Sequence, residues 1–422
     1  IFDSHFDERI PFGNKLEIEA EISEGSLNLV WNYSSLNYKA DTIKRLSNNF
    51  KAHLNALIEY CANQGERKFT LSDFNLPKEV TESQLNELQG FLLEEKLLDT
   101  FSPSSTYRLS PLQEGILFHS LYSKFSDVYL EQLRVDIEGE PDLEAMKASW
   151  NHVLESHSAL RSGFLFQNSV APLQYVADDI EMPFAYFDYS SELQDDIDKK
   201  LAAFLESDRE LGFEMERAPL MRIGLIRTGK LSYSMVLTHH HLIIDGWSLA
   251  LILKKFIEAY DKFSKGLEPS IISVDSYKEF IDYLNRRNQV KDETFWQDYL
   301  RNITASCKLP FYKFNETLPN DYKGRGNLRW EISRGLAKKI EQYTKKNQIT
   351  MSTLVQGTWS YLIAKYKQTS DVVFGVTVSG RPSDIPNIEQ RVGLYINTLP
   401  LVVTIKPDLS IKEWLSSIQL GH

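Results

Sequence analysis

The sequence predicts a mixed α/β protein that contains more than one folding unit. The chain has 422 residues, more than one ordinary hydrophobic core accommodates. Hydrophobic residues make up 42% of it and charged residues 25%, which is typical of a soluble globular protein. After Leu109, stretches with the two-residue period of strands alternate with stretches of helical period, which favours layered α/β sandwiches.

The N-terminal segment, residues 1–62, predicts a hairpin followed by a helix. Apolar and polar residues alternate over 16–33, which indicates two short antiparallel strands. Apolar residues recur three and four positions apart over 41–62, which indicates one face of an amphipathic helix.

Residues 63–106 have the composition of a linker that carries one short helix. Thr81 is the expected N-cap of that helix, which we place at 82–96. A serine-rich joint follows over 101–108, and we expect the main domain boundary there.

Beyond this boundary, helical and strand patterns follow one another. Helices are expected at about 111–121, 142–156 and 194–207, and after Ser248 and Ser352. Strands are expected at about 132–137, 163–166, 231–237 and 372–378.

Charge and composition argue against several classes of function. The formal net charge is −11, which disfavours a nucleic-acid or anionic-membrane partner. The two cysteines, Cys61 and Cys307, lie far apart in the sequence, so we expect neither a disulfide nor a zinc–thiolate site. This cysteine usage suits a reducing cytoplasm. We find no apolar run long enough to cross a membrane and no signal peptide.

Three consecutive histidines end the strand expected near 231–237. His241 is followed four residues later by Asp245, and Gly246 then permits the backbone to bend, including to positive φ. A tight turn at a strand end presents an imidazole at the mouth of a sheet. A neutral imidazole accepts a proton from an amine or a hydroxyl near pH 7, so we expect His241 to be the chemical centre.

Three other interpretations of these histidines remain open. Only His239 and His241 share a strand face, so a metal site needs a third ligand from Asp245 or from elsewhere, and we expect no metal. The histidines could instead be hydrogen-bonded residues that close a core strand. Ser248 or Ser379 could be the nucleophile of a serine triad, although no Gly-x-Ser-x-Gly motif is present.

The run from His240 to Gly246 resembles the His-His-x-x-x-Asp-Gly motif of condensation domains of nonribosomal peptide synthetases and of related chloramphenicol acetyltransferase-like acyltransferases. Residues 109–120, Leu-Ser-Pro-Leu-Gln-Glu-Gly-Ile-Leu-Phe-His-Ser, resemble the opening condensation motif in the form of the subclass that follows an epimerisation domain. Residues 156–164 resemble the second motif, with Ser156 in place of the usual Arg. Two later family motifs are similar to residues 375–382 and 392–400.

This resemblance implies a two-lobed, chloramphenicol acetyltransferase-like sandwich, a pseudo-dimer in a V shape. It implies a condensation domain over 107–422, with an N-lobe of about 107–270 and a C-lobe of about 271–422 that is incomplete at its C-terminus. Residues 1–62 resemble the C-terminal segment of an epimerisation domain, and 63–106 resemble the linker that follows one.

The resemblance also implies amide formation between two substrates that arrive on phosphopantetheine arms of carrier domains, with no cofactor bound directly. The implied partners are an upstream donor carrier, a downstream acceptor carrier, and neighbouring adenylation and epimerisation domains. The subclass implies a D-configured donor residue. We expect no nucleic-acid, membrane or metal partner.

Each site residue receives an expected role from the same resemblance. His241, with His240 beside it, would hold or deprotonate the attacking amine, and Gly246 would bring its backbone N–H near the thioester oxygen. We expect Asp245 to form a structural ion pair with Arg161, the alternative being a solvated Asp in a turn. The candidate tunnel residues are Trp247, Ser379, Tyr395 and Asn397.

Two rival functions share this fold. Epimerisation domains carry the same histidine motif, but they usually continue Asp-Gly-Val-Ser-Trp-Arg, whereas this chain has Asp245-Gly246-Trp247-Ser248. Heterocyclisation domains replace the histidines by paired aspartates, which does not fit. A non-catalytic docking domain that keeps the fold is the other alternative.

Overall fold

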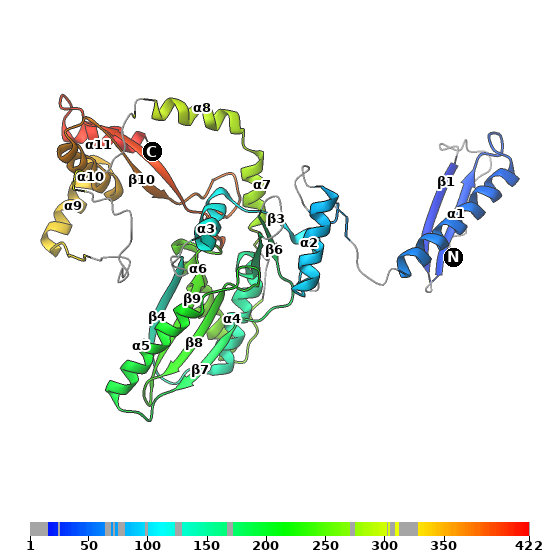
Figure 1. Cartoon of the computed structure of the whole chain (residues 1–422), viewed down its shortest axis with the longest axis horizontal. Helices are drawn as coiled ribbons and strands as arrows, with labels where there is room; N and C mark the ends of the chain where they lie inside the picture. The colour runs from blue at the N-terminus through cyan, green and yellow to red at the C-terminus, as the bar shows by residue number, and fades with distance from the viewer. Residues whose placement is uncertain are drawn as a thin grey trace. The chain divides into compact units, whose positions relative to one another are not determined.

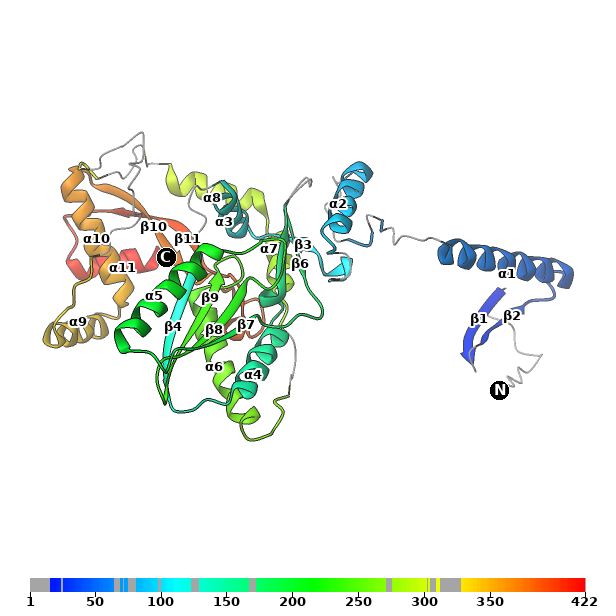
Figure 2. The ribbon, with the colours of Figure 1, turned by 60° about the horizontal axis from the view of Figure 1, so that its bottom comes forward.

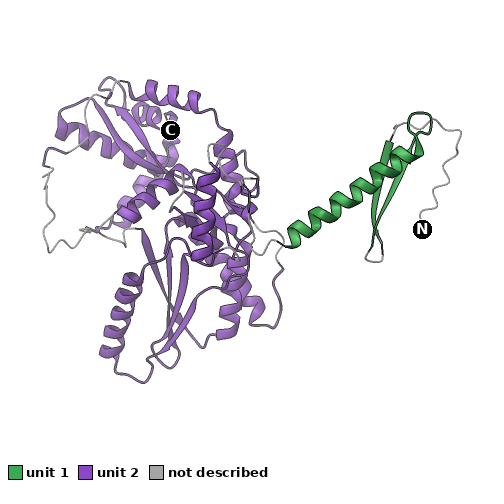
Figure 3. Cartoon of the chain, turned by 45° about the vertical axis from the view of Figure 1, so that its right-hand side comes forward, with its two compact units in different colours: residues 1–69 green, residues 70–422 purple. Residues whose placement is uncertain are grey.

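In a computed structural model, the protein divides into two compact units, residues 1–69 and residues 70–422 (Figure 3). The structure describes residues 16–23, 26–63, 69–70, 72–74, 81–97, 100–122, 129–166, 172–270, 275–301, 303, 309–311 and 328–421. Cys307 and most of the expected polar linker before Thr81 lie outside the described residues.

The first unit consists of a β-hairpin and one long helix, as the sequence predicts. Strands β1 (Leu16–Ser23) and β2 (Ser26–Tyr33) pair antiparallel, and helix α1 (Ala40–Ala62) follows (Figure 1). Trp31 packs edge-on against Phe50 of the helix, with ring centroids 5.8 Å apart. Many of its large apolar side chains are exposed: Ile18, Ile22, Leu27, Val30, Leu36, Leu46, Phe50, Leu57 and Ile58.

The second unit begins earlier than the sequence suggests. Helix α2 (Glu82–Glu94), which we placed in a linker, starts at the predicted cap Thr81 and buries Leu88 and Leu92. Beyond the end of the helix, Glu95 receives a hydrogen bond from Arg217 at 3.0 Å. By its contacts, α2 thus belongs to the larger compact unit, which begins at residue 70, whereas the sequence places the main joint at 101–108.

Replacing the buried Leu92 by alanine tests whether α2 belongs to the larger unit. We expect the free energy of unfolding of that unit to fall by about 2–5 kcal/mol, because the substitution removes apolar burial and leaves a cavity. Its exposed neighbour offers a matched control, and Leu93→Ala should change stability by about 0.5 kcal/mol or less. Equal effects of the two variants in urea unfolding followed by tryptophan fluorescence would contradict this assignment.

The core of the second unit is a four-stranded sheet in the order β4 (Leu130–Glu138), β9 (Ser232–His240), β8 (Met221–Arg227) and β7 (Phe184–Asp188). The β7–β8 pair is parallel and the others are antiparallel. Helices α4 (Leu143–Ser156) and α6 (Gly246–Phe263) pack on one face, against Leu237 and Leu225. Helix α5 (Gln194–Leu211) covers the other face, against Val236 and Ile226 (Figure 2). The side chains of neighbouring residues in one strand thus pack against helices on opposite faces of the sheet.

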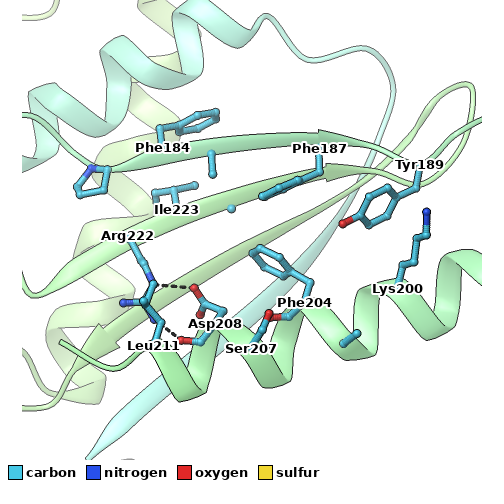
Figure 4. A pocket seen from close by; sticks show the side chains of 14 residues that line it. Phe184, Phe187, Tyr189, Lys200, Phe204, Ser207, Asp208, Leu211, Arg222 and Ile223 are labelled. Carbon is cyan, nitrogen blue, oxygen red and sulfur yellow. Dashed lines mark hydrogen bonds and ion pairs between the residues drawn. The ribbon is translucent and has the colours of Figure 1, made fainter.

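An apolar cavity of about 940 Å³ lies between α5 and the edge strand β7 (Figure 4). Phe204 of the helix lies against Gly224, where an added Cβ would come within 2.5 Å of its ring. At one end, Asp208 forms an ion pair with Arg222 at 2.6 Å and so fastens the helix to β8.

Three shorter strands and helix α3 complete the first part of this unit. A small sheet has the order β3 (Tyr107–Arg108), β6 (Leu173–Val176) and β5 (Ser162–Leu165). Helix α3 (Pro111–Tyr122) follows β3, and the 3-10 turns η1 (Pro103–Ser105) and η2 (Ser158–Arg161) precede β3 and β5.

The remaining chain forms helices around a two-stranded hairpin. The hairpin pairs β10 (Asp371–Val378) antiparallel with β11 (Asn397–Thr404), and residues of β10 and β11 form a core with helices α10 (Met351–Lys367) and α11 (Ile411–Leu420). The other elements are α7 (Lys278–Arg286), α8 (Gln289–Leu300), α9 (Arg334–Asn347) and the 3-10 turn η3 (Ile388–Gln390). Within the described residues, no helix combines the length and apolar character needed to cross a bilayer.

Candidate active site

The expected histidine turn lies between the central strand β9 and helix α6. Strand β9 ends at His240, and α6 begins at Gly246 with Asp245 as its N-cap. The backbone N–H of His241 donates to the carbonyl of Tyr129 at 2.8 Å, which extends the pairing of β9 with β4 by one residue. The fold therefore presents His241 at the end of the sheet, as the sequence predicts.

The imidazole of His241 is fixed in one orientation by its own turn. Its Nδ1 lies 2.8 Å from the carbonyl oxygen of Ile244. Because a carbonyl only accepts, Nδ1 carries the proton of the neutral ring and Nε2 keeps its lone pair. The side chain is partly exposed, so Nε2 is the nitrogen with which the ring can accept a proton from a nucleophile.

His240 has the opposite arrangement and is buried, with 1% of its surface exposed. Its Nδ1 accepts the backbone N–H of Leu242 at 3.1 Å, and its Nε2 lies 3.4 Å from the hydroxyl of Ser120. Burial lowers the pKa of His240 to about 3. Burial also lowers the pKa of His239 to about 4, although the carboxylate of Glu131 acts in the opposite direction.

These depressed pKa values make the stability depend on pH. Unfolded histidine binds a proton below about pH 6.5, whereas folded His240 stays neutral down to about pH 3. The unfolded state therefore gains protons first, and each such histidine removes up to about 1.4 kcal/mol of stability per pH unit as the pH falls between these values.

As the pH falls from 7 to 5, we expect the free energy of unfolding to decrease less in the variant His240→Gln than in the wild type. Urea unfolding at each pH measures this. The exposed histidine on α3 supplies the control, since His119→Gln should keep the wild-type pH slope. An unchanged slope in His240→Gln would refute this account of the buried imidazole.

Asp245 joins the turn to a distant segment, residues 393–396. One carboxylate oxygen accepts the N–H of Ser248 at 2.8 Å and lies 3.5 Å from the guanidinium of Arg381. The other accepts the backbone N–H groups of Tyr395 at 3.0 Å and Ile396 at 3.2 Å. The carboxylate is buried and satisfied by four donors, so the solvated-turn alternative is wrong.

The expected ion pair of Asp245 with Arg161 is also wrong. Arg161 ends the turn η2, and its guanidinium donates to the backbone carbonyls of Ala177 and Asp178. The actual cation is Arg381, whose side chain is 3% exposed. Arg381 falls within residues 375–382, which resemble a family motif, but no role was expected of it. Its position inside that motif was the sequence signal that could have identified it as a site residue.

Arg381 is itself held from several sides. It donates to the carbonyls of Ile388 and Arg391 and to the hydroxyl of Ser248, and it lies over the ring of Tyr395 at 4.2 Å. Gly380 has a φ of +59°, and a Cβ there would come within 1.7 Å of the Tyr395 carbonyl oxygen. Glycine at this position thus lets the Arg381 backbone approach the segment that Asp245 holds.

Three of the four candidate tunnel residues line one cavity. Ser379, Tyr395 and Asn397 face a space of about 670 Å³ beside Arg381, and burial raises the pKa of Tyr395. Trp247 is not among the residues that line it; this side chain is 53% exposed and donates to the carbonyl of Glu389.

Two further expectations about this site are changed by the geometry. Gly246 is the first residue of α6 and does not have a positive φ, so the turn does not require left-handed backbone there. The hydroxyl of Ser248 donates to the carbonyl of Gly393 at 2.7 Å, which makes it a structural group rather than a nucleophile. Within the described part of the chain, no three His, Cys, Asp or Glu side chains gather as metal ligands.

Comparison with known proteins identifies the family of this chain. A family model described as Condensation domain matches residues 104–420. The chain belongs to the condensation-domain family. A linear gramicidin synthase protein of Brevibacillus parabrevis is 32% identical over 407 residues, 96% of this chain and 8% of that protein. Bacitracin synthase 1 of Bacillus licheniformis is 30% identical, again over 96% of this chain and 8% of that protein.

Solved structures show the same fold. The first condensation domain of the calcium-dependent antibiotic synthetase, in complex with a substrate analogue, superimposes with a TM-score of 0.58, 18% identity and 75% coverage of each chain. The complex of the X-domain and OxyB from teicoplanin biosynthesis gives a TM-score of 0.60 at 19% identity, with 74% of this chain and 68% of that chain covered. The expected α/β class, that of condensation domains, is confirmed. The chain spans less than a tenth of the length of these two curated relatives.

Proposed function

We propose that this condensation domain forms an amide between two carrier-bound substrates. The acceptor amine attacks the donor thioester carbonyl, the C–N bond forms, and the C–S bond breaks to release the donor thiol. The observation that carries the proposal is the imidazole of His241, whose Nδ1–H is bound within its turn while Nε2 is left as an acceptor at the sheet end. The peptide-antibiotic synthases among the relatives support it.

His241 acts as much by alignment as by basicity. An α-amine has a pKa of about 8, so about a tenth of it is already the free, nucleophilic amine at pH 7. General-base help raises the rate about 10²–10⁴-fold. Positioning two tethered reactants lowers the activation barrier by up to about 7–11 kcal/mol, which is the larger effect. Nε2 of His241 therefore holds the amine in line with the carbonyl and takes its proton as the bond forms.

The neighbouring residues shape the site around this imidazole. His240 is a positioning residue that holds the turn through Leu242, and the backbone N–H of Gly246 lies near the thioester oxygen in the reacting complex. The cavity lined by Ser379, Tyr395 and Asn397 serves as part of the substrate tunnel, and Trp247 does not line that cavity.

The N-terminal unit is the end of an upstream epimerisation domain in this proposal. Its exposed apolar side chains support the idea, because a hairpin and helix with so little buried surface are typical of a piece of a larger layered domain. The donor is then a D-configured residue on an upstream carrier, and adenylation domains load the carriers in the cytoplasm.

An intact module with both carriers loaded tests the proposed reaction. We expect mass spectrometry to find the donor acyl group transferred to the acceptor arm by amide linkage. Inversion of the donor α-carbon without transfer would assign epimerisation instead. Neither product, with both carriers bound, would assign a docking role.

A further inference from the structure

The opening motif, residues 109–120, contributes one member of a buried pair of side-chain amides that the proposed chemistry does not use. Gln113 of α3 is 2% exposed and Gln174 of β6 is fully buried. Each donates to the other, with N–O distances of 3.3 Å and 3.0 Å. Buried amides of this kind are retained only where their hydrogen bonds are satisfied.

Every hydrogen-bonding position of the Gln113 amide is occupied. Besides its bonds with Gln174, its oxygen accepts the N–H of Ser110 at 2.9 Å, and its nitrogen donates to the carbonyl of Leu242 at 3.0 Å. The amide has two donors and two acceptor positions, so these four hydrogen bonds to three partners fix its orientation. Gln174 also donates to the carbonyl of Arg108, and its side-chain hydrogen bonds among the described residues go to Arg108 and Gln113 rather than to the turn.

Leu242 is the residue after His241, and its carbonyl lies inside the histidine turn. Leu242 is fully buried, so this carbonyl has no access to water, and Gln113 is its partner. Without that donor the Leu242–Ile243 peptide plane can rotate, and this plane lies in the turn between His241 and Ile244. Helix α3 meets the turn at a second point, where Ser120 lies 3.4 Å from His240.

We infer that Gln113 is a positioning residue for the condensation reaction, because it holds the turn in which His241 keeps its single tautomer. This inference rests on the proposed function for its kinetic consequence. Gln113 touches no reacting atom and acts through the Leu242 carbonyl. This hydrogen bond fixes the Leu242–Ile243 peptide between His241 and Ile244, and so the contact of the His241 Nδ1 with the Ile244 carbonyl.

¹⁵N NMR of the imidazole rings, in the full chain labelled with ¹⁵N-histidine, tests the inference without relying on activity. The His241 signals are assigned by their loss in His241→Ala. The wild type should show one protonated and one unprotonated ring nitrogen, and both Gln113→Met and Gln113→Glu should replace this pattern by an average of two tautomers. The matched variant Gln174→Met loses a buried amide but keeps the donor to Leu242, so it should keep the wild-type pattern.

The kinetic readout separates positioning from general destabilisation. In the intact module we expect both Gln113 variants to lower kcat at least tenfold with little change in KM, and Gln174→Met to stay within about threefold of the wild type. A wild-type nitrogen pattern in both Gln113 variants, or the same loss in Gln174→Met, would overturn the inference. A wild type that forms no amide would refute the proposed function, and the nitrogen signals would still decide the role of Gln113.

Discussion

Replacing Asp245 by alanine is expected to lower the free energy of unfolding of residues 70–422 by about 3–5 kcal/mol. The substitution removes an acceptor from the buried backbone N–H groups of Ser248 and Tyr395 and from the partly buried N–H of Ile396. It also leaves the buried guanidinium of Arg381 without its carboxylate. An unpaired buried charge costs more than the pair contributes, so this variant should rank among the most destabilised single substitutions of the unit.

The same prediction has an internal control and a coupling test. Asp384 lies in the loop that follows Arg381 and is exposed, so Asp384→Ala should change stability by about 0.5 kcal/mol or less. In the double variant Asp245→Ala/Arg381→Ala no unpaired charge remains, and its loss should be smaller than the sum of the two single losses. Guanidinium chloride unfolding measures all four proteins. Additive losses, or an Asp245→Ala midpoint equal to that of Asp384→Ala, would contradict the pairing.

Long periodic segments of this chain could be predicted from the sequence, whereas of the short strands only β5 was expected, near 163–166. The amphipathic pattern of 41–62 and the alternation before the histidines match α1 and β9 closely, because a repeated period specifies one face. Strand β6 has four residues and β3 has two, too few to establish an alternation. The parallel strand β7 depends on its neighbour β8 rather than on its own pattern.

The candidate site shows the same division between local and distant information. The turn from His241 to Asp245 is a local feature, and its placement between a strand and a helix was predicted correctly. The partner of Asp245 lies 136 residues away in Arg381, and sequence spacing carries no information about which of several arginines closes that distance. Geometry distinguishes Arg381 from Arg161, which donates to the backbone carbonyls of Ala177 and Asp178 rather than to Asp245.

Removal of the His241 imidazole should reduce condensation strongly while the fold survives. The side chain is partly exposed and makes one hydrogen bond, to a carbonyl of its own turn, so His241→Ala should cost little stability. The variant loses the acceptor that aligns the amine and takes its proton, which is worth about 10²–10⁴-fold in rate. Some reaction should remain, because two tethered substrates still meet at high effective concentration.

The rate of a single turnover in the intact module, with both carriers loaded before mixing, measures this most directly. We predict that His241→Ala forms the amide at least about 10²-fold more slowly than the wild type, with an unchanged unfolding midpoint, while the exposed control His119→Ala keeps the wild-type rate. A His241→Ala variant that condenses its substrates at the wild-type rate would contradict the central claim that this imidazole meets the attacking nitrogen.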